Sequence, residues 1–252
     1  MIATVVKKAK VPDEEFHWEP TKEKPPTIND ILKLLEKGLY KANAHELLAD
    51  IFECGAIAIS NQFDRAQRQE REAQYMRIIQ KYDKGMQKLI AEIFAKIGLL
   101  LSQQINPFVG FNDYLGELYM RSETSNKHTG QFFTPYCVSK MCAEVTLNEK
   151  TINEYIEQDK IFTLSEPACG AGGMIIAAAD VLYNKYHFNI SRNLFVIGSD
   201  IDSRCVHMSY LQLSFAGIPA VIYKQNTLTL QTWERWVTPP CIMQYTRFKP
   251  YM

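Results

Sequence analysis

Three glycines that lie between two acidic residues form the part of the sequence best suited to bind a ligand. The segment from Glu166 to Gly173 reads E-P-A-C-G-A-G-G, and Asp200 follows after a second apolar run. Glycines let the backbone approach a ligand closely and direct its N–H groups toward it. A carboxylate at the end of the next strand can accept hydrogen bonds from both hydroxyls of a ribose.

The acid that precedes the glycines limits the kind of ligand. The spacing differs from the dinucleotide fingerprint G-x-G-x-x-G, and Glu166 would repel the phosphates of a dinucleotide. A positively charged or zwitterionic ligand that contains adenosine would be favoured, and S-adenosylmethionine (SAM) has this character. The alternative is an ordinary strand-turn-helix in which the glycines only allow close packing.

The elements that would position these residues are typical of a parallel α/β sheet. An apolar run at 161–165 precedes the glycines, and an apolar helical segment at 174–183 follows them. A second apolar run at 194–198 ends just before Asp200, and a third begins at Ala220. This order predicts a doubly wound sheet with a ligand site at the carboxyl ends of its strands.

The composition is that of a globular protein without a strong overall charge. The 252 residues are 46% hydrophobic and 22% charged, as in soluble globular domains. Lys+Arg and Asp+Glu both number 28, whereas a free-standing nucleic-acid-binding protein usually has a basic excess. Any affinity for DNA must therefore be local or come from a partner.

The sequence indicates neither a metal site nor a membrane segment. The six cysteines and five histidines show no spacing of metal ligands, so we expect no metal. The sequence begins without a signal peptide and contains no apolar run of membrane-spanning length. We therefore expect a cytoplasmic protein that does not contact a membrane.

The first 106 residues predict an arm followed by helices. Residues 1–27 mix Lys, Glu and Pro with few regular apolar positions, which indicates an extended arm. Residues 28–106 are expected to form a helical domain, with its second helix over about 44–61 and a long third helix over about 65–104.

An apolar stripe runs along the third expected helix from Tyr75 to Leu100, in steps of three and four residues. Such a stripe is either the internal packing of a helical bundle or a coiled-coil contact with another subunit. Residues 65–71, at the start of this helix, are too polar for burial, so we expect them to project into solvent.

Three sequence motifs in a fixed order resemble those of the N6-adenine DNA methyltransferases of the type I modification-subunit kind. They are D-Y-L-G-E-L-Y-M from Asp113, G-Q-F-F-T-P from Gly130 and E-P-A-C-G-A-G-G from Glu166. The resemblance is close from 111 to 228. It implies a SAM-dependent methyltransferase (Rossmann-like) sheet over residues 107–252, incomplete at its C-terminus.

The same resemblance implies which residues bind SAM. It places Gln131 to Pro135 over the methionine end of SAM, with the hydroxyl of Thr134 near the carboxylate. It implies that Glu166 faces the amino group of SAM, Asp200 the ribose and Asn226 the adenine. The expected cofactor-binding residues are Gln131, Phe132, Phe133, Thr134, Glu166, Pro167, Ala168, Gly170, Gly172, Asp200, Ile201 and Asn226.

The motif that would bind a target adenine departs from the family's pattern. The resembling enzymes have an apolar strand that ends in Asn-Pro-Pro and an aromatic residue, which hold and stack on a flipped adenine. Here the run Thr229 to Val237, too polar for a buried strand, precedes Thr238, Pro239, Pro240 and Cys241. Thr has no amide carbonyl, and Cys cannot stack on a base. The chain is therefore either an inactive relative that keeps the SAM pocket or an enzyme with a weakened catalytic site at Thr238, Pro239 and Pro240.

The function expected from these observations is that of a SAM-binding protein of the N6-adenine DNA methyltransferase class, related to restriction-modification, with weak or no catalysis on its own. It would reach DNA directly or through a partner subunit, and helices 28–106 would offer a surface for a protein partner. The alternative is a non-enzymatic, anti-restriction-type subunit that binds a restriction-modification or DNA-processing complex.

Overall fold

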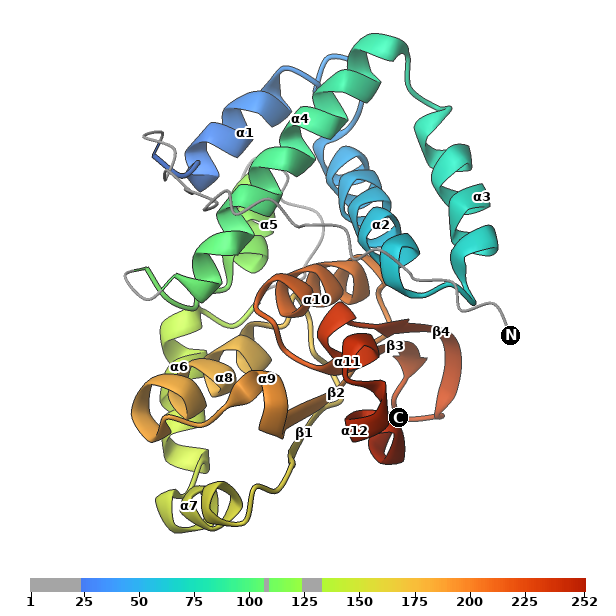
Figure 1. The fold of residues 1–252 in the computed structure, drawn as a ribbon. Coiled ribbons are helices and arrows are strands. Elements are labelled where there is room, and N and C mark those ends of the chain that lie inside the picture. Colours follow the sequence, from blue (N-terminus) through green and yellow to red (C-terminus); the bar gives the residue numbers. More distant parts are fainter. Residues whose placement is uncertain (1–23, 107–108, 124–132) are drawn as a thin grey trace, which may run out of the picture.

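Four strands form a single sheet in the C-terminal half of the chain. The structure, a computed structural model, describes residues 24–106, 109–123 and 133–252 (Figure 1). The strands lie in the order β1-β2-β3-β4, where β1 is Phe162–Glu166, β2 Leu194–Asp200, β3 Ala220–Asn226 and β4 Gln231–Val237. The first three strands are parallel, and β4 runs antiparallel to β3. The expected α/β fold with a parallel sheet is confirmed.

Helices connect the parallel strands and cover one face of the sheet. α8 (Gly173–Tyr186) and α9 (Ile190–Asn193) connect β1 to β2, and α10 (Ser203–Phe215) connects β2 to β3. α6 (Tyr136–Thr146) and α7 (Glu149–Glu157) precede β1 and pack against α8. Because side chains alternate along a strand, Leu194 and Val196 join the core formed with α8 and α10, whereas Phe195 lies on the opposite face.

The C-terminal segment packs on that opposite face. Its elements are α11 (Pro239–Met243), α12 (Tyr245–Phe248) and the 3-10 helix η2 (Lys249–Tyr251). The ring of Phe248 stacks on that of Phe195 with 5.7 Å between the ring centres. Val221, Val237 and Cys241 complete this smaller cluster.

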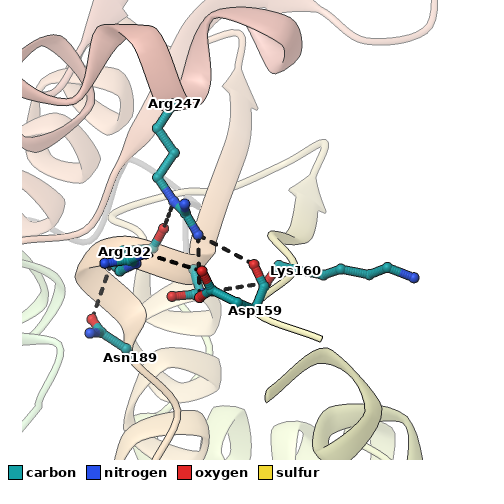
Figure 2. Close-up of polar contacts among 6 residues, drawn as sticks. Asp159, Lys160, Asn189, Arg192 and Arg247 are labelled. Atoms are coloured by element: carbon teal, nitrogen blue, oxygen red, sulfur yellow. Dashed lines mark hydrogen bonds and ion pairs between the residues drawn. The ribbon is translucent and has the colours of Figure 1, made fainter. Parts of the chain in front are cut away.

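Asp159 fastens the C-terminal segment to the amino ends of β1 and β2 (Figure 2). Its carboxylate accepts hydrogen bonds from Asn193 at 2.8 Å and from Arg192 at 3.0 Å, and these bonds lower the pKa of Asp159. The Nε of Arg247, in α12, donates to the carbonyl of Arg192 at 2.8 Å. The segment after β4 is thereby held at the edge of the sheet where the parallel strands begin.

The N-terminal half of the described chain is helical and shares its core with the sheet. Its elements are α1 (Ile28–Glu36), α2 (Ala44–Phe63), α3 (Arg68–Ile79), α4 (Lys84–Leu101), the 3-10 helix η1 (Ser102–Ile105) and α5 (Tyr114–Glu123). α2 packs against α10, and one continuous cluster of buried side chains runs from α1 to β3. The domain division at residue 106 stays a prediction. In the described part of the chain, no helix is long and apolar enough to span a membrane.

The single long helix expected over 65–104 is wrong, because the chain turns between α3 and α4. Asp83 caps α4 by accepting the N–H of Met86 at 2.9 Å. The side-chain amide of Gln87 donates to the carbonyl of Tyr82 at 2.9 Å, which satisfies a backbone group in the turn. Residues of the apolar stripe on both sides of the turn are buried in the chain's own core, among them Ile78 and Ile93, so the stripe is internal packing.

Arg71 is buried, which contradicts the expectation that all of 65–71 project into solvent. Its guanidinium pairs with Asp64 at 3.3 Å and donates to the carbonyl of Arg235 at 2.9 Å. It also lies 4.1 Å from the centre of the Trp236 ring. Arg235 lies 164 residues further along the chain, so local polarity could not reveal this burial.

The polar run before Thr238 forms a strand, although the sequence indicated that it was too polar for a buried one. β4 pairs only with β3 and lies at the edge of the sheet, where most of its side chains stay exposed or half-exposed. Trp236 and Val237, at its end, are buried. An edge strand needs only a few buried side chains, which accounts for its polar sequence.

Candidate functional site

The carboxyl ends of the parallel strands bring Glu166, Asp200 and Asn226 to one edge of the sheet. Each is the last residue of its strand. Glu166 pairs with Gly198 of β2, and Asp200 pairs with Lys224 of β3, so each strand extends two residues beyond the end of its predecessor. This is the edge at which the sequence predicts a ligand.

The loop after β1 adopts backbone conformations that require glycine. Gly170 and Gly172 have φ values of +53° and +95°. A β-carbon at Gly170 would lie 3.2 Å from the ring of Phe133, and one at Gly173 would lie 2.6 Å from the carboxylate of Asp113. Close packing is therefore one reason for the glycines, and it is compatible with a ligand above the loop.

Asp200 is bonded directly to the glycine loop. One carboxylate oxygen accepts the N–H of Gly170 at 2.9 Å, and the other accepts the N–H of Asp202 at 2.9 Å. A carboxylate oxygen can accept more than one hydrogen bond, so both oxygens keep capacity for a ligand hydroxyl. The side chain is half-buried, and its position is fixed by the backbone of two loops.

Two hydrogen bonds also fix the position of the residues between β1 and the glycines. The carboxylate of Glu166 accepts the N–H of Ala168 at 3.2 Å. The hydroxyl of Thr227 donates to the carbonyl of Pro167 at 2.6 Å, which ties this loop to the loop after β3. The expected residues Glu166, Pro167 and Ala168 thus lie at the end of β1 and in the loop after it, which is tied to the loop after β3.

Asn226 and Ile201 lie at the same edge with different surroundings. The side-chain oxygen of Asn226 accepts the N–H groups of Leu228 and Thr229, both at 3.1 Å, and so closes the turn after β3. Ile201 is 61% exposed and could cover a flat ligand. The side-chain oxygen of Asn226 thus already has hydrogen-bond partners within the protein.

A buried polar network beneath the glycine loop was missed by the sequence reasoning. The side-chain nitrogen of Gln212 donates to Asp113 and to the carbonyl of Ala171, both at 2.7 Å. Ser209 donates to the carbonyl of Gly170 at 2.7 Å. Burial raises the pKa of Asp113, although the bond from Gln212 opposes this change. Ser209 and Gln212, one turn apart in an apolar helix, were the available signal.

A cavity of about 120 Å³ lies beside the glycine loop. Phe133 and Thr134 line it next to Gly170, and Asp113 and Ser139 also line it. The structure therefore brings two of the residues expected at the methionine end of SAM to the loop. The other two, Gln131 and Phe132, lie outside the described residues.

The beginning of α6 borders this cavity. The helix starts at Tyr136, after Pro135, which provides no side-chain cap. The hydroxyl of Ser139, in the first turn, is buried and has no hydrogen-bond partner among the described residues. A helix N-terminus favours an anion, and an unpaired hydroxyl can donate to one, so this part of the cavity suits a carboxylate.

Thr238, Pro239 and Pro240 are not brought to this edge of the sheet. Thr238 lies beside the first residue of β3: its N–H donates to the carbonyl of Ala220 at 3.0 Å, and its hydroxyl accepts the N–H of Ala220 at 2.8 Å. β3 has seven residues, so Thr238 is about 20 Å from Asn226 at the other end of the strand. Thr238 and Pro239 are buried.

Replacement of Thr238 by Val is expected to lower the free energy of unfolding by about 1–3 kcal/mol, because the buried N–H of Ala220 loses its acceptor. Urea denaturation would measure the change. Thr232→Val, in the exposed part of β4, is the matched control and should change stability by less than about 0.5 kcal/mol. Equal stability of Thr238→Val and the unmodified protein would contradict a structural role for this hydroxyl.

Comparisons with known proteins give one match to a sequence family and, among others, two distant structural similarities. A family model described as N-6 DNA Methylase matches residues 112–248, more than half of the chain. A protein from Listeria monocytogenes described as a candidate class I S-adenosylmethionine-dependent methyltransferase is 13% identical, with a TM-score of 0.41 over 80% of this chain and 54% of that chain. A type I restriction-modification methyltransferase subunit from Streptococcus thermophilus is 15% identical, with a TM-score of 0.39 over 80% of this chain and 39% of that chain. This chain thus spans about half or less of the proteins that it resembles. No curated protein matches it.

Proposed function

Since the chain belongs to the N-6 DNA methylase family, we propose that it binds S-adenosylmethionine at the carboxyl edge of its sheet. The observation that supports this most directly is the bond of 2.9 Å between Asp200 and the N–H of Gly170. This bond holds a carboxylate that can bind a ribose beside a loop whose backbone conformation only glycine adopts readily.

The charges at this edge fit SAM better than a phosphate ligand. Glu166, Asp200 and Asp113 place three carboxyl groups around the loop, although burial raises the pKa of Asp113. SAM carries a sulfonium and an ammonium group, which this field attracts, whereas a pyrophosphate would be repelled. The cavity of about 120 Å³ is smaller than whole-ligand pockets of roughly 300–1,000 Å³, so it corresponds to one end of SAM.

Each of these residues has a defined task. When bound, SAM supplies a methyl group activated by its sulfonium centre. Asp200 accepts hydrogen bonds from the ribose hydroxyls, and Glu166 accepts them from the ammonium group. Thr134 and Ser139 donate to the carboxylate at the beginning of α6. The proposed site consists of Phe133, Thr134, Ser139, Glu166, Pro167, Ala168, Gly170, Gly172, Asp200, Ile201 and Asn226.

Methyl transfer by this chain alone is weak or absent in this proposal. Within residues 133–252, the only Pro-Pro pair is Pro239-Pro240, which follows Thr238 instead of the Asn expected for an adenine-binding loop. The pair lies at the amino edge of the sheet, away from the proposed SAM site. A net charge of zero supports the view that contact with DNA is local or provided by a partner subunit.

Replacement of Asp200 by Ala is expected to weaken SAM binding roughly ten- to a hundredfold, because charge-assisted hydrogen bonds to the ribose are worth about 1.5–3 kcal/mol. Isothermal titration calorimetry of the whole chain would measure the dissociation constants.

Asp202→Asn is the matched control for this titration. Asp202 is the next acid along the loop, but its carboxylate caps α10 and pairs with Arg204 at 2.5 Å. The variant Asp202→Asn should therefore bind SAM with nearly the affinity of the unmodified chain. An affinity that is unchanged in Asp200→Ala, or absent in the unmodified chain, would exclude the proposed site.

A further inference from the structure

The motif D-Y-L-G-E-L-Y-M has no task in the function proposed above, although its first residue, Asp113, lines the cavity beside the glycine loop. Asp113 is 6% exposed and directly precedes α5. Its oxygen Oδ1 accepts the N–H of Gly116 at 2.9 Å and the side-chain amide of Gln212 at 2.7 Å. These bonds cap the first turn of α5 and use one of the two carboxylate oxygens.

The other oxygen of Asp113, Oδ2, is available to a ligand. In the described part of the chain it has no hydrogen-bond partner, and it is not one of the side-chain atoms that are fully enclosed there. It therefore keeps a small surface open to the cavity that Asp113 lines. Buried polar atoms nearly always have a partner, because an unpaired one retains the cost of its lost hydration.

Two glycines leave the space that this carboxylate occupies. A β-carbon at Gly173 would lie 2.6 Å from Oδ2, and one at Gly116 would lie closer still, so a side chain at either position would displace the carboxylate. Glycine weakens a helix, because it loses more conformational freedom on folding than other residues do. Both glycines nevertheless lie in helices, Gly116 in α5 and Gly173 at the first position of α8. Together they hold Asp113 against the end of the glycine loop.

The negative charge of Asp113 has no positive partner among the residues that the structure describes. Those that line the cavity include no Lys, Arg or His, and the charged group that acts on the pKa of Asp113 is the like charge of Glu117. Burial raises the pKa of Asp113, and the bonds to Oδ1 lower it. A cation in the cavity would supply the missing opposite charge and favour the ionised carboxylate. This part of the cavity wall therefore suits an ammonium group.

Asp113 lies close enough to Asp200 for one ligand to meet both. Asp200 accepts the N–H of Gly170, and Asp113 lies beside Gly173. Three residues of chain span at most about 10 Å, so the two carboxylates flank the ends of one short turn. In SAM, a short chain that contains the sulfonium joins the ribose to the carbon that carries the ammonium group.

We propose that Asp113 determines the specificity of this site by accepting a hydrogen bond from the ammonium group of SAM through Oδ2. This assignment rests on the proposed function, in which Glu166 also accepts from the ammonium group. An ammonium group has three N–H donors, so it serves both carboxylates. Through Asp113 the chain distinguishes SAM and its product from adenosine compounds that lack an ammonium group.

Calorimetric titration of the whole chain with S-adenosylhomocysteine and with its deamino analogue, in which hydrogen replaces the ammonium group, tests this assignment. The unmodified chain should bind S-adenosylhomocysteine roughly ten- to a hundredfold more tightly, because the analogue lacks a charge-assisted hydrogen bond. Asp113→Asn should reduce this preference roughly tenfold and leave the affinity for the analogue unchanged. Its amide oxygen can keep the bonds from Gly116 and Gln212, so the fold is retained.

Glu117→Gln is the matched control. Glu117 is an exposed acid of the same helix that pairs with Arg121 at 3.0 Å, so both affinities should stay unchanged. An equal preference in Asp113→Asn and the unmodified chain would overturn the inference and leave the proposed function intact. Equal loss of affinity for both ligands in Asp113→Asn would also overturn it, because Asp113 would then have a structural role only. An unmodified chain that binds neither ligand would overturn the proposed function and this inference together.

Discussion

Incubation of this chain alone with tritiated SAM and adenine-containing DNA is expected to transfer methyl groups roughly a thousandfold to a hundred-thousandfold more slowly than an active enzyme of the family. Transfer to an exocyclic amine requires acceptors for its N–H groups and an aromatic ring beneath the flipped base. In the sequence, Thr238 and Cys241 occupy the positions at which these groups are expected. In the structure, both are buried at the amino edge of the sheet. Loss of stacking costs about 1–3 kcal/mol, and loss of a transition-state hydrogen bond costs about 2.7–4 kcal/mol.

The assay needs a complete N6-adenine methyltransferase as its positive control. A calorimetric titration of the same preparation with SAM would show whether the cofactor site is intact. Methylation of adenine by this chain at the rate of the control enzyme would contradict the prediction. Methylation that begins only when a second polypeptide is added would identify the chain as one subunit of an enzyme.

The second large effect is expected at Arg71, whose replacement by Ala should lower the free energy of unfolding by about 3–5 kcal/mol. Removing the guanidinium leaves the carboxylate of Asp64 and the carbonyl of Arg235 without this donor, and it removes the cation from the ring of Trp236. Urea denaturation followed by tryptophan fluorescence would measure the loss, because Trp236 reports on this contact.

Arg68 offers the control for this measurement. It lies one turn earlier in α3 and is exposed, so Arg68→Ala should change stability by less than about 0.5 kcal/mol. Similar stabilities of the two variants would mean that the buried guanidinium contributes no more than a surface charge.

The sheet and the glycine loop could be predicted because their signals are local. The runs at 161–165 and 194–198 are short, apolar and bounded by turn residues, and they became the body of β1 and β2. Asp200 lies two residues after the end of the second run, so its position at the carboxyl edge required only the assumption of parallel strands. Its bond to Gly170 depends on the approach of two loops, which no local pattern encodes.

The errors came from residues whose partners are distant in sequence. The apolar stripe continues across the turn at Asp83 because α3 and α4 both direct it into the core, so periodicity alone concealed the break. β4 is polar because it has one neighbour only. The placement of Thr238 depended on the direction of β4: an antiparallel strand returns the chain to the amino edge, whereas a parallel one would have ended at the ligand.

The polar residues under the loop were hidden for another reason. Asp113, Ser139 and Gln212 have the residue types of a solvated surface, yet all three are buried. Gln212 of α10 bonds both Asp113 and the carbonyl of Ala171 beneath the glycine loop, and Ser139 lies in the first turn of α6 beside the same cavity. No local pattern in the sequence indicates that these three side chains meet beneath the loop.

The packing of α2 against α10 has a consequence for the synthesis of the chain on the ribosome. About 140 residues separate the end of α2 from the beginning of α10. At roughly 5–20 residues per second, the apolar face of α2 waits on the order of ten seconds for the helix that covers it. During that interval the side chains of α2 that will contact α10 can meet a chaperone or the same face of another nascent chain. The N-terminal helices of this protein therefore complete their folding only after the first two strands of the sheet have been made.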